Sequence, residues 1–366
     1  MRIREPFMRS SRATGFLSAA ILAVVAGSAV AAQAQANAFL PGPLAVVSTV
    51  PSNGDQNPYG VVFIPASFNV GTGPLKHSDI LVSNFNNNLN LQGTGSTIVR
   101  LTAPGIQTLF YQGPSGIGLS TALGTLQEGF IVVGNAPSVD GTAATAGPGS
   151  LLVISNQGKL LQTITDPNIQ SPWDMALVDQ GTTAVAYVTN ALTGDVSRLN
   201  FNVGATGLTL TSSKVIASGY VHRGDPVTFF VAPTGLVYDA PSGNLYVAST
   251  GDNAVFVIHN AATLTSSVGT GSIVYQDNVH LHGALGLSEA PNGHLLVTNN
   301  DGINVDPTQP SEIVEFTKGG EFVKELSVDP ALGGSFGLAV NTVGDVATFA
   351  FVDDNTASLT VETLIQ

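Results

Sequence analysis

The 366-residue sequence has no cysteine, one tryptophan and few charged residues, since Asp, Glu, Lys and Arg together make up 10% of it. Without cysteine the chain has no disulfide to staple a small core and no thiolate to act as ligand or nucleophile. A domain of this length is instead large enough to be stabilised by buried apolar area alone. Basic residues are scarcer than acidic ones, and the net charge of −13 argues against nucleic acid or an anionic membrane as a partner.

Several local signatures of enzymes are also missing. The sequence contains no nucleophile elbow, no phosphate-cradling loop and no Cys-His metal set, and Gly93-Thr94-Gly95 is ordinary loop composition. Beyond the first 36 residues, no apolar run is long enough to span a bilayer. Function must therefore be sought in scattered polar residues that the fold brings together.

The first 36 residues have the composition of a secretory signal peptide. Four arginines precede the apolar residues 16–30, and Ala32-Gln33-Ala34-Gln35-Ala36 offers A-x-A cleavage sites, with cleavage expected after Ala36. A membrane anchor is the alternative, which the short apolar run disfavours. Removal of residues 1–36 lowers Lys and Arg from 12 to 8 and Asp and Glu from 25 to 24, a net charge of about −16. We expect residues 37–366 to form one periplasmic or extracellular domain without a membrane span.

Residues 285–326 have the pattern of four short strands joined by turns. The turns are Ala290-Pro291-Asn292-Gly293 and Thr317-Lys318-Gly319-Gly320, and the segments between are rich in β-branched and aromatic residues. A single sheet of this kind cannot bury both of its faces. Neighbouring sheets of the same kind are therefore expected elsewhere in the chain.

Opening strands similar to the one at residue 285 recur six times. Spacings of 58, 56, 61, 51 and 51 residues separate Gly60, Gly118, Asp174, Gly235, Gly286 and Gly337. Each opening strand is followed by a return strand that ends in a small polar residue: Asn84, Asn135, Asn190, Ser249, Asn299 and Asp353. Six sheets of roughly 40–60 residues predict an all-β fold, a six-bladed β-propeller of four-stranded antiparallel blades.

The two ends of the chain complement each other. Residues 44–50 form a spare strand before the first repeat, whereas the last repeat ends at Gln366 after only three strands. We expect the N-terminal strand to complete the last blade, because this pairing closes the ring and removes an exposed sheet edge.

Loop lengths predict where binding occurs. Strands alternate in direction within a blade, so the loops between second and third strands and the inter-blade connections lie on one face. Several of the longest irregular loops are on this long-loop face: residues 85–96, 135–149, 219–233 and 300–310, whereas residues 65–78 form a long loop on the opposite face. Long loops on a rigid scaffold often carry binding residues, although insertions that are merely tolerated look the same.

The repeat resembles the blade of NHL-type propellers. Gly235-Leu236 is followed by Gly243-Asn244-Leu245-Tyr246-Val247-Ala248, and then by Asn253 and an apolar strand. The resemblance covers nearly the whole chain after residue 36 and is weakest in the second and last blades. It implies a six-bladed ring with a central channel. Related propellers include binding modules, and also lactonases and lyases that hold a divalent metal at the channel mouth.

The resemblance also implies where such a metal would be held. Lactonase-like propellers use Glu, Asn and Asp at the strand ends that face the channel, and the comparable residues here are Asn84, Asn135, Asn190, Asn299 and Asp174. Oxygen ligands of this kind suit Ca²⁺ or Mg²⁺. The family's acidic residue at the first opening strand has no counterpart, since Tyr59-Gly60 stands there. The asparagines alternatively close turns by bonding their own backbone.

A lyase-like centre would place a histidine and a glutamate beside the metal. His282 precedes the fifth opening strand and is expected near the channel mouth, where it would act with Asp174 as a catalytic residue. Glu312 begins a third strand and is expected farther from the axis. A surface or packing role is the alternative for His282.

Candidate ligand-binding residues lie around the same mouth. His222, Arg223 and Asp225 are on the inter-blade loop, and the arginine suits an anionic group unless it simply pairs with Asp225. Tyr59 and Trp173 stand at blade openings, where Trp173 either stacks on a ligand or plugs the core. We therefore expect an exported, monomeric, NHL-like propeller that binds a small molecule or protein through the long-loop face. The alternative is a metal-dependent hydrolase or lyase at the channel mouth, so the sequence leaves open whether the protein is an enzyme.

Overall fold

The structure is a computed structural model that describes residues 38–40, 45–102 and 105–365. The expected signal peptide, residues 1–36, lies outside the described residues. Strands dominate the described part, and its helices are two 3-10 turns, η1 (Ala143–Thr145) and η2 (Ala261–Thr263). No helix in these ranges is long and apolar enough to cross a membrane.

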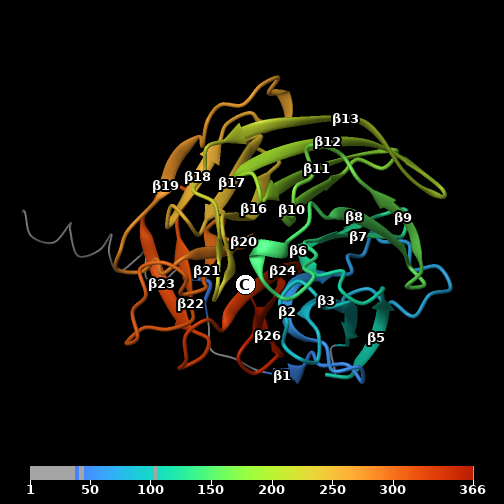
Figure 1. The fold of residues 1–366 in the computed structure, drawn as a ribbon, viewed down its shortest axis with the longest axis horizontal. Coiled ribbons are helices and arrows are strands. Elements are labelled where there is room, and N and C mark those ends of the chain that lie inside the picture. Colours follow the sequence, from blue (N-terminus) through green and yellow to red (C-terminus); the bar gives the residue numbers. More distant parts are fainter. Residues whose placement is uncertain (1–37, 41–44, 103–104, 366) are drawn as a thin grey trace, which may run out of the picture. The chain divides into compact units, whose positions relative to one another are not determined.

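Six four-stranded antiparallel sheets follow one another along the chain and form the predicted six-bladed propeller (Figure 1). Blade 1 contains β2 (Gln56–Phe63), β3 (Ile80–Asn86), β4 (Thr97–Leu101) and β5 (Gln107–Gln112). Blade 2 contains β6 (Leu119–Leu126), β7 (Phe130–Asn135), β8 (Ser150–Ser155) and β9 (Leu160–Ile164). Blade 3 contains β10 (Pro172–Asp179), β11 (Thr183–Asn190), β12 (Asp195–Gly204) and β13 (Gly207–Ser218).

The second half of the ring repeats this arrangement after a small insertion. The inserted hairpin consists of β14 (Arg223–Asp225) and β15 (Phe229–Val231). Blade 4 contains β16 (Pro233–Asp239), β17 (Asn244–Ser249), β18 (Ala254–Ile258) and β19 (Ser272–Tyr275). Blade 5 contains β20 (Ala284–Glu289), β21 (Leu295–Asn299), β22 (Glu312–Phe316) and β23 (Phe322–Ser327). Blade 6 contains β24 (Ser335–Val343), β25 (Val346–Asp353), β26 (Ser358–Ile365) and β1 (Ala45–Ser48).

The N-terminal strand closes the ring as predicted. β1 pairs antiparallel with β26, with Ala45 opposite Val361 and Ser48 opposite Ser358. Innermost strands of neighbouring blades contact each other all the way round, including β2 with β24. The edge of β26 is therefore covered by the first strand of the chain.

The recurring glycine of the opening strands has a packing role. Each innermost strand carries a β-bulge at a corresponding position, and in four blades the bulge contains a glycine: Gly60, Gly235, Gly286 and Gly337. A Cβ atom on Gly286 would lie 2.5 Å from the Phe336 carbonyl oxygen of the next blade. Glycine thus allows neighbouring bulges to approach closely at the axis.

In the second blade the innermost strand begins later in the sequence than expected. Its innermost strand begins at Leu119, and Gly116 and Gly118 belong to the turn before it, with φ of 79° and 63°. Only glycine adopts such backbone angles without steric cost, which explains their presence at the entrance. The bulge of this blade lies between Leu119 and Leu123 and contains no glycine.

In blades 1, 3 and 5, a hydroxyl group on the second strand forms a hydrogen bond to the next blade. Thr298 Oγ1 accepts a hydrogen bond from Gly286 N and donates one to Phe336 O of blade 6, both at 2.7 Å. Ser83 and Thr189 make equivalent pairs of bonds in blades 1 and 3. Because these hydroxyls are buried, each bond satisfies polar backbone atoms at the bulge.

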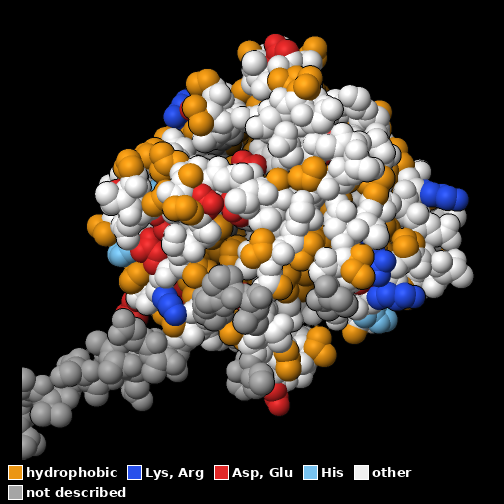
Figure 2. Space-filling view, turned by 90° about the horizontal axis from the view of Figure 1, so that it is seen from below, with side chains coloured by type: hydrophobic (Ala, Val, Ile, Leu, Met, Phe, Trp, Pro, Cys, Tyr) orange, Lys and Arg blue, Asp and Glu red, His pale blue; other side chains and the backbone are white. Residues whose placement is uncertain are grey.

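Apolar layers between the blades supply most of the core. One such layer joins blades 2 and 3 through Leu126, Val153, Ala186 and Phe201, and another joins blades 4 and 5 through Val255, Leu287 and Phe316. The outer surface is poor in charge, and Figure 2 shows charged side chains scattered among uncharged ones. Buried area rather than surface ion pairs therefore stabilises the ring.

Candidate functional site

A small cavity lies on the axis of the ring. Its volume is about 100 Å³, and it is lined by innermost-strand residues of all six blades: Tyr59, Gly60, Val61, Thr121, Leu123, Asp174, Met175, Leu236, Gly286, Leu287, Gly337 and Leu338. Pockets for small organic ligands usually measure at least about 300 Å³. The axial cavity has room for an ion or a few water molecules, and a larger substrate would not fit.

Asp174 is the carboxylate of this cavity. It occupies the bulge position that is glycine in four other blades, and its oxygens accept hydrogen bonds from Met175 N at 2.8 Å and Leu236 N at 3.0 Å. Burial raises the pKa of Asp174 to about 7, because the carboxyl faces the cavity and the interior rather than bulk water, and these two hydrogen bonds offset only part of the effect. The side chain therefore changes charge near neutral pH.

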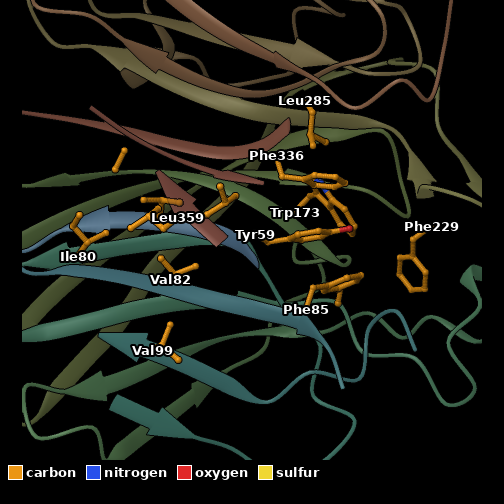
Figure 3. Close-up of a cluster of buried hydrophobic side chains, with 14 of the residues drawn as sticks. Tyr59, Ile80, Val82, Phe85, Val99, Trp173, Phe229, Leu285, Phe336 and Leu359 are labelled. Atoms are coloured by element: carbon orange, nitrogen blue, oxygen red, sulfur yellow. The ribbon is translucent and has the colours of Figure 1, made fainter. Parts of the chain in front are cut away.

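An aromatic cluster closes the channel toward the long-loop face (Figure 3). Tyr59 stacks on Phe85 with ring centroids 4.5 Å apart and on Phe336 at 4.8 Å. Trp173 contacts Phe85 edge to face at 5.3 Å. Phe229 covers Phe85 and Trp173 from the hairpin, at 5.3 and 6.2 Å. We call Tyr59, Phe85, Trp173, Phe229, Phe230 and Phe336 the aromatic plug.

The plug contains two of the candidate ligand-binding residues, Tyr59 and Trp173. Each of these side chains is 1% exposed, so neither presents a ring face to solvent. The alternative role for Trp173, a plug in the core, agrees with its burial. Phe229 and Phe230 were not predicted; the signal was an adjacent pair of phenylalanines in the inter-blade loop.

The hairpin β14–β15 delivers these phenylalanines. Asp225 Oδ1 accepts hydrogen bonds from Val227 N at 2.9 Å and Thr228 N at 3.0 Å, which shapes the turn between the two strands. Phe229 follows with φ of 65°, a rare conformation for a bulky residue. The backbone is thus turned so that the Phe229 ring enters the cluster, and burial of the ring offsets the conformational cost.

The asparagines proposed as metal ligands bond backbone carbonyls of other segments of the chain. Three of them end the second strands of their blades, and their Nδ2 atoms donate to carbonyls shortly before the innermost strands: Asn135 to Ile117, Asn190 to Asn168 and Asn299 to His280. Asn84 lies two residues before the end of β3, and its Nδ2 donates to the Thr49 carbonyl directly after β1. All four are buried. No three His, Asp or Glu side chains converge as metal ligands in the described ranges. These residues do not fit a divalent-metal centre at the mouth.

His282 lies apart from Asp174. It is 2% exposed beneath the loop after β21, and its Nδ1 is 2.6 Å from the Asn304 carbonyl oxygen. Its backbone N donates to Asn299 Oδ1 at 3.1 Å. His282 does not line the axial cavity, so the structure does not bring the two proposed catalytic residues together.

Glu312, and not Asp174, is the acidic residue that hydrogen bonds connect to His282. Asn299 links the two, because its Nδ2 donates to Glu312 Oε2 at 3.1 Å while its Oδ1 binds His282 N. Burial raises the pKa of Glu312 to about 7, Asp301 adds to this effect, and His282 opposes it. His282 Nε2, Glu312 Oε1 and Asp301 Oδ1 are buried without a hydrogen-bond partner among the described residues. We call His282, Asp301 and Glu312 the blade-5 polar cluster. It is a second place, besides Asp174 in the axial cavity, where titratable side chains are buried.

A groove lies beside the hairpin on the long-loop face. Its volume is about 450 Å³, and it is lined by Gln92, residues 141–144, residues 224–226 and Phe229. Arg223 is at its border: the side chain is 48% exposed and lies 4.0 Å from Asp225, too far for a tight ion pair. His222 is exposed, with Nδ1 3.1 Å from the Tyr220 carbonyl oxygen. The groove thus combines apolar lining residues with the carboxylate of Asp225, and the loosely paired Arg223 lies at its border.

No protein-family model matches the sequence, and no curated protein is significantly similar to it. Solved structures share the fold at low identity. A gluconolactonase from Xanthomonas campestris has a TM-score of 0.51 and 11% identity over 89% of this chain and 99% of its own. A virginiamycin B lyase from Staphylococcus aureus has a TM-score of 0.50 and 13% identity over 88% and 99%. Regucalcin from Agrobacterium tumefaciens, a calcium-binding protein, has a TM-score of 0.51 and 13% identity over 88% and 94%. The chain is therefore a six-bladed β-propeller whose structural neighbours include lactonase- and lyase-type propellers.

Proposed function

We propose that this protein is a binding module of the periplasm or cell exterior, and that its long-loop face contacts a partner with an apolar surface. The observation that carries the proposal is the placement of exposed apolar side chains. Among the described large hydrophobic residues, five are more than 60% exposed: Val46, Leu89, Val139, Val227 and Val279. All except Val46 lie at the tips of long-loop-face connections. Exposed apolar side chains gathered on one face of a protein favour an interaction surface there.

The closed channel supports binding at the surface rather than in the axis. The aromatic plug covers the mouth, and the axial cavity is too small for an organic substrate. The groove beside the hairpin is large enough for a side chain or a small ligand, and Arg223 at its border suits an anionic group.

Retention of partners on immobilised protein tests the proposal. The probe is medium and envelope extract of the source organism, with quantitative mass spectrometry of bound proteins. The variant combines Leu89→Ser, Val139→Ser and Val227→Ser. The matched control combines Ile106→Ser, Leu160→Ser and Val343→Ser, which are also exposed but lie toward the short-turn face. We expect a partner retained by the wild type and the control to be lost with the long-loop variant. Equal retention by all three proteins contradicts the proposal.

Arg223→Ala tests the groove separately. Because Arg223 is half-exposed and its pair with Asp225 is loose, the substitution is expected to change the free energy of unfolding by less than about 1 kcal/mol. Binding of the partner identified above should weaken. Unchanged affinity would remove Arg223 and its neighbours His222 and Asp225 from the binding site.

A metal-dependent hydrolase or lyase is the second candidate function, and the fold of the neighbouring lactonase and lyase supports it. The residues available to it are Asp174 in the axial cavity and the blade-5 polar cluster around His282 and Glu312. Elemental analysis of protein purified without chelator distinguishes the candidates. Stoichiometric Ca²⁺ or Mg²⁺ that is lost in Asp174→Asn or Glu312→Gln would favour the enzyme, whereas sub-stoichiometric metal in the wild type favours the binding module.

A further inference from the structure

Glu315 in β22 is a buried carboxylate that binds the start of the described chain. Its side chain is 0% exposed. Phe39 N lies 3.0 Å from Oε1 and 2.8 Å from Oε2, and Leu40 N lies 3.1 Å from Oε2. Asn292 Nδ2 donates to Oε1 at 3.1 Å, and His294 Nδ1 is 2.6 Å from the same oxygen. The site therefore surrounds one carboxylate with five hydrogen-bonding contacts.

The geometry at Phe39 also suits an α-ammonium group. Both oxygens of Glu315 lie within hydrogen-bonding distance of one nitrogen, yet a peptide nitrogen has a single hydrogen to share between them. An α-ammonium has three hydrogens and donates to each oxygen separately. It also supplies a positive charge to a carboxylate that has left water, beside His294, which is 18% exposed, and Lys324, which lies opposite Glu315 in the sheet.

The residues after this nitrogen are packed, which fixes its position. The Phe39 ring contacts Phe349 edge to face at 5.7 Å, and Leu40 is 2% exposed in the apolar layer between blades 5 and 6. Lys324 Nζ donates to the Leu40 carbonyl at 2.6 Å. Phe39 and Leu40 are therefore anchored on the short-turn face.

The sequence before Phe39 permits cleavage at this point. Ala36-Asn37-Ala38 is an A-x-A motif that ends directly before Phe39. We propose that signal peptidase hydrolyses the Ala38–Phe39 bond and that the new α-ammonium of Phe39 forms a buried ion pair with Glu315. Water adds across the peptide bond, leaving a carboxylate on Ala38 and the ammonium on Phe39. This inference rests on the predicted signal peptide, moves its cleavage site by two residues, and is independent of the proposed binding function.

N-terminal sequencing and intact mass of the exported protein test the cleavage site. The full-length chain is expressed in a host that secretes it, and the mature form is purified from the periplasm or medium. We expect the N-terminal sequence Phe-Leu-Pro-Gly-Pro. A start at Asn37 or Gln35, or retention of residues 1–38, overturns the proposal.

Two defined N-termini test the ion pair. Fusion proteins cleaved to start at Phe39 or at Asn37 are compared by thermal melting, each with wild-type Glu315, with Glu315→Gln, and with the exposed control Glu321→Gln. We expect the form that starts at Phe39 to melt roughly 3–6 °C higher than the other, and the difference to disappear only in Glu315→Gln. Equal melting temperatures with wild-type Glu315 contradict the ion pair.

Labelling of the α-amine provides a test that needs no variant at residue 315. In the folded form that starts at Phe39, an amine-reactive ester should modify the α-amine much more slowly than in the unfolded chain, because the amine is buried against Glu315. Mass spectrometry of the N-terminal peptide measures both rates. Equal rates would show a solvent-exposed amine and would overturn the proposal.

Discussion

Gly337 packs against Tyr59 so closely that a Cβ atom built on the glycine would overlap the tyrosine carbonyl oxygen. The two residues belong to the last and first blades, and the Phe336 ring stacks on the Tyr59 ring at the same seam. Backbone contact therefore closes the ring at the axis, while β1 closes it at the rim.

Gly337→Ala is expected to lower the free energy of unfolding by about 3 kcal/mol, because the added methyl group forces apart two backbones that have no side chain to move aside. Chemical denaturation measures the change. Gly319→Ala is the control, since a Cβ atom there would lie 3.5 Å from Thr317 Oγ1, an ordinary contact. Similar stabilities of the two variants would show that the seam is able to relax.

Deletion of residues 38–52 should destabilise the fold far more than trimming a terminus usually does. It removes β1, exposes the edge of β26, and withdraws Leu40 from the layer between blades 5 and 6. Thermal melting provides the measurement, and Val46→Ser, at an exposed position of β1, is the control. A truncated protein that melts within about 2 °C of the wild type would contradict a stabilising role for the pairing of β1 with β26.

Asp174 should make stability depend on pH in a direction opposite to most aspartates. Its pKa is about 7 in the folded state and near 3.8 when exposed, so between these values the folded state binds an extra proton. Its contribution is therefore fully present below about pH 4 and is lost as the pH rises through 7. At about 1.4 kcal/mol for each pH unit, the loss is at most about 4 kcal/mol.

Asp174→Asn is expected to flatten this dependence between pH 4 and 8, as measured by chemical denaturation at several pH values. Glu312 and Asp354, whose burial raises their pKa values to about 7, and Glu362, whose pKa burial raises to about 6, titrate in the same direction but remain in both proteins. The difference between the proteins therefore isolates Asp174. The exposed variant Asp345→Asn should behave like the wild type. Parallel curves for Asp174→Asn and wild type would place the carboxyl in contact with bulk water.

Phe229→Ala should open the aromatic plug and cost about 3–5 kcal/mol of stability. Trp173 is the one tryptophan of the chain, so its fluorescence reports on the plug directly. We expect blue-shifted emission in the wild type and a red shift with increased iodide quenching in the variant. The exposed variant Val227→Ala leaves the ring in place and should leave the spectrum unchanged. A spectrum of Phe229→Ala that matches the wild type would show that water does not enter.

The fold was predictable because its strongest constraints are local in sequence. Bulge residues such as Gly286 recur because neighbouring backbones meet at the axis, and turns such as residues 290–293 carry their own signature. The site was less predictable. Whether Asn299 binds a metal or a carbonyl depends on the chain segment that lies opposite, and the Phe229–Phe85 contact joins residues from separate parts of the ring. Neither of these contacts is marked by a repeating pattern in the sequence.

The pairing of β1 with β26 has a consequence for how the chain folds. The first strand of the described residues pairs with the last, so the ring remains an open arc until both ends of the propeller domain have come together. Individual blades pair strands that are close in sequence and can form early, but the closing contact carries the largest loop-closure entropy in the molecule. Until that moment the edge of β26 and the apolar face of blade 6 are exposed to other chains. Aggregation during folding should therefore start at this seam and not at the blades that form first.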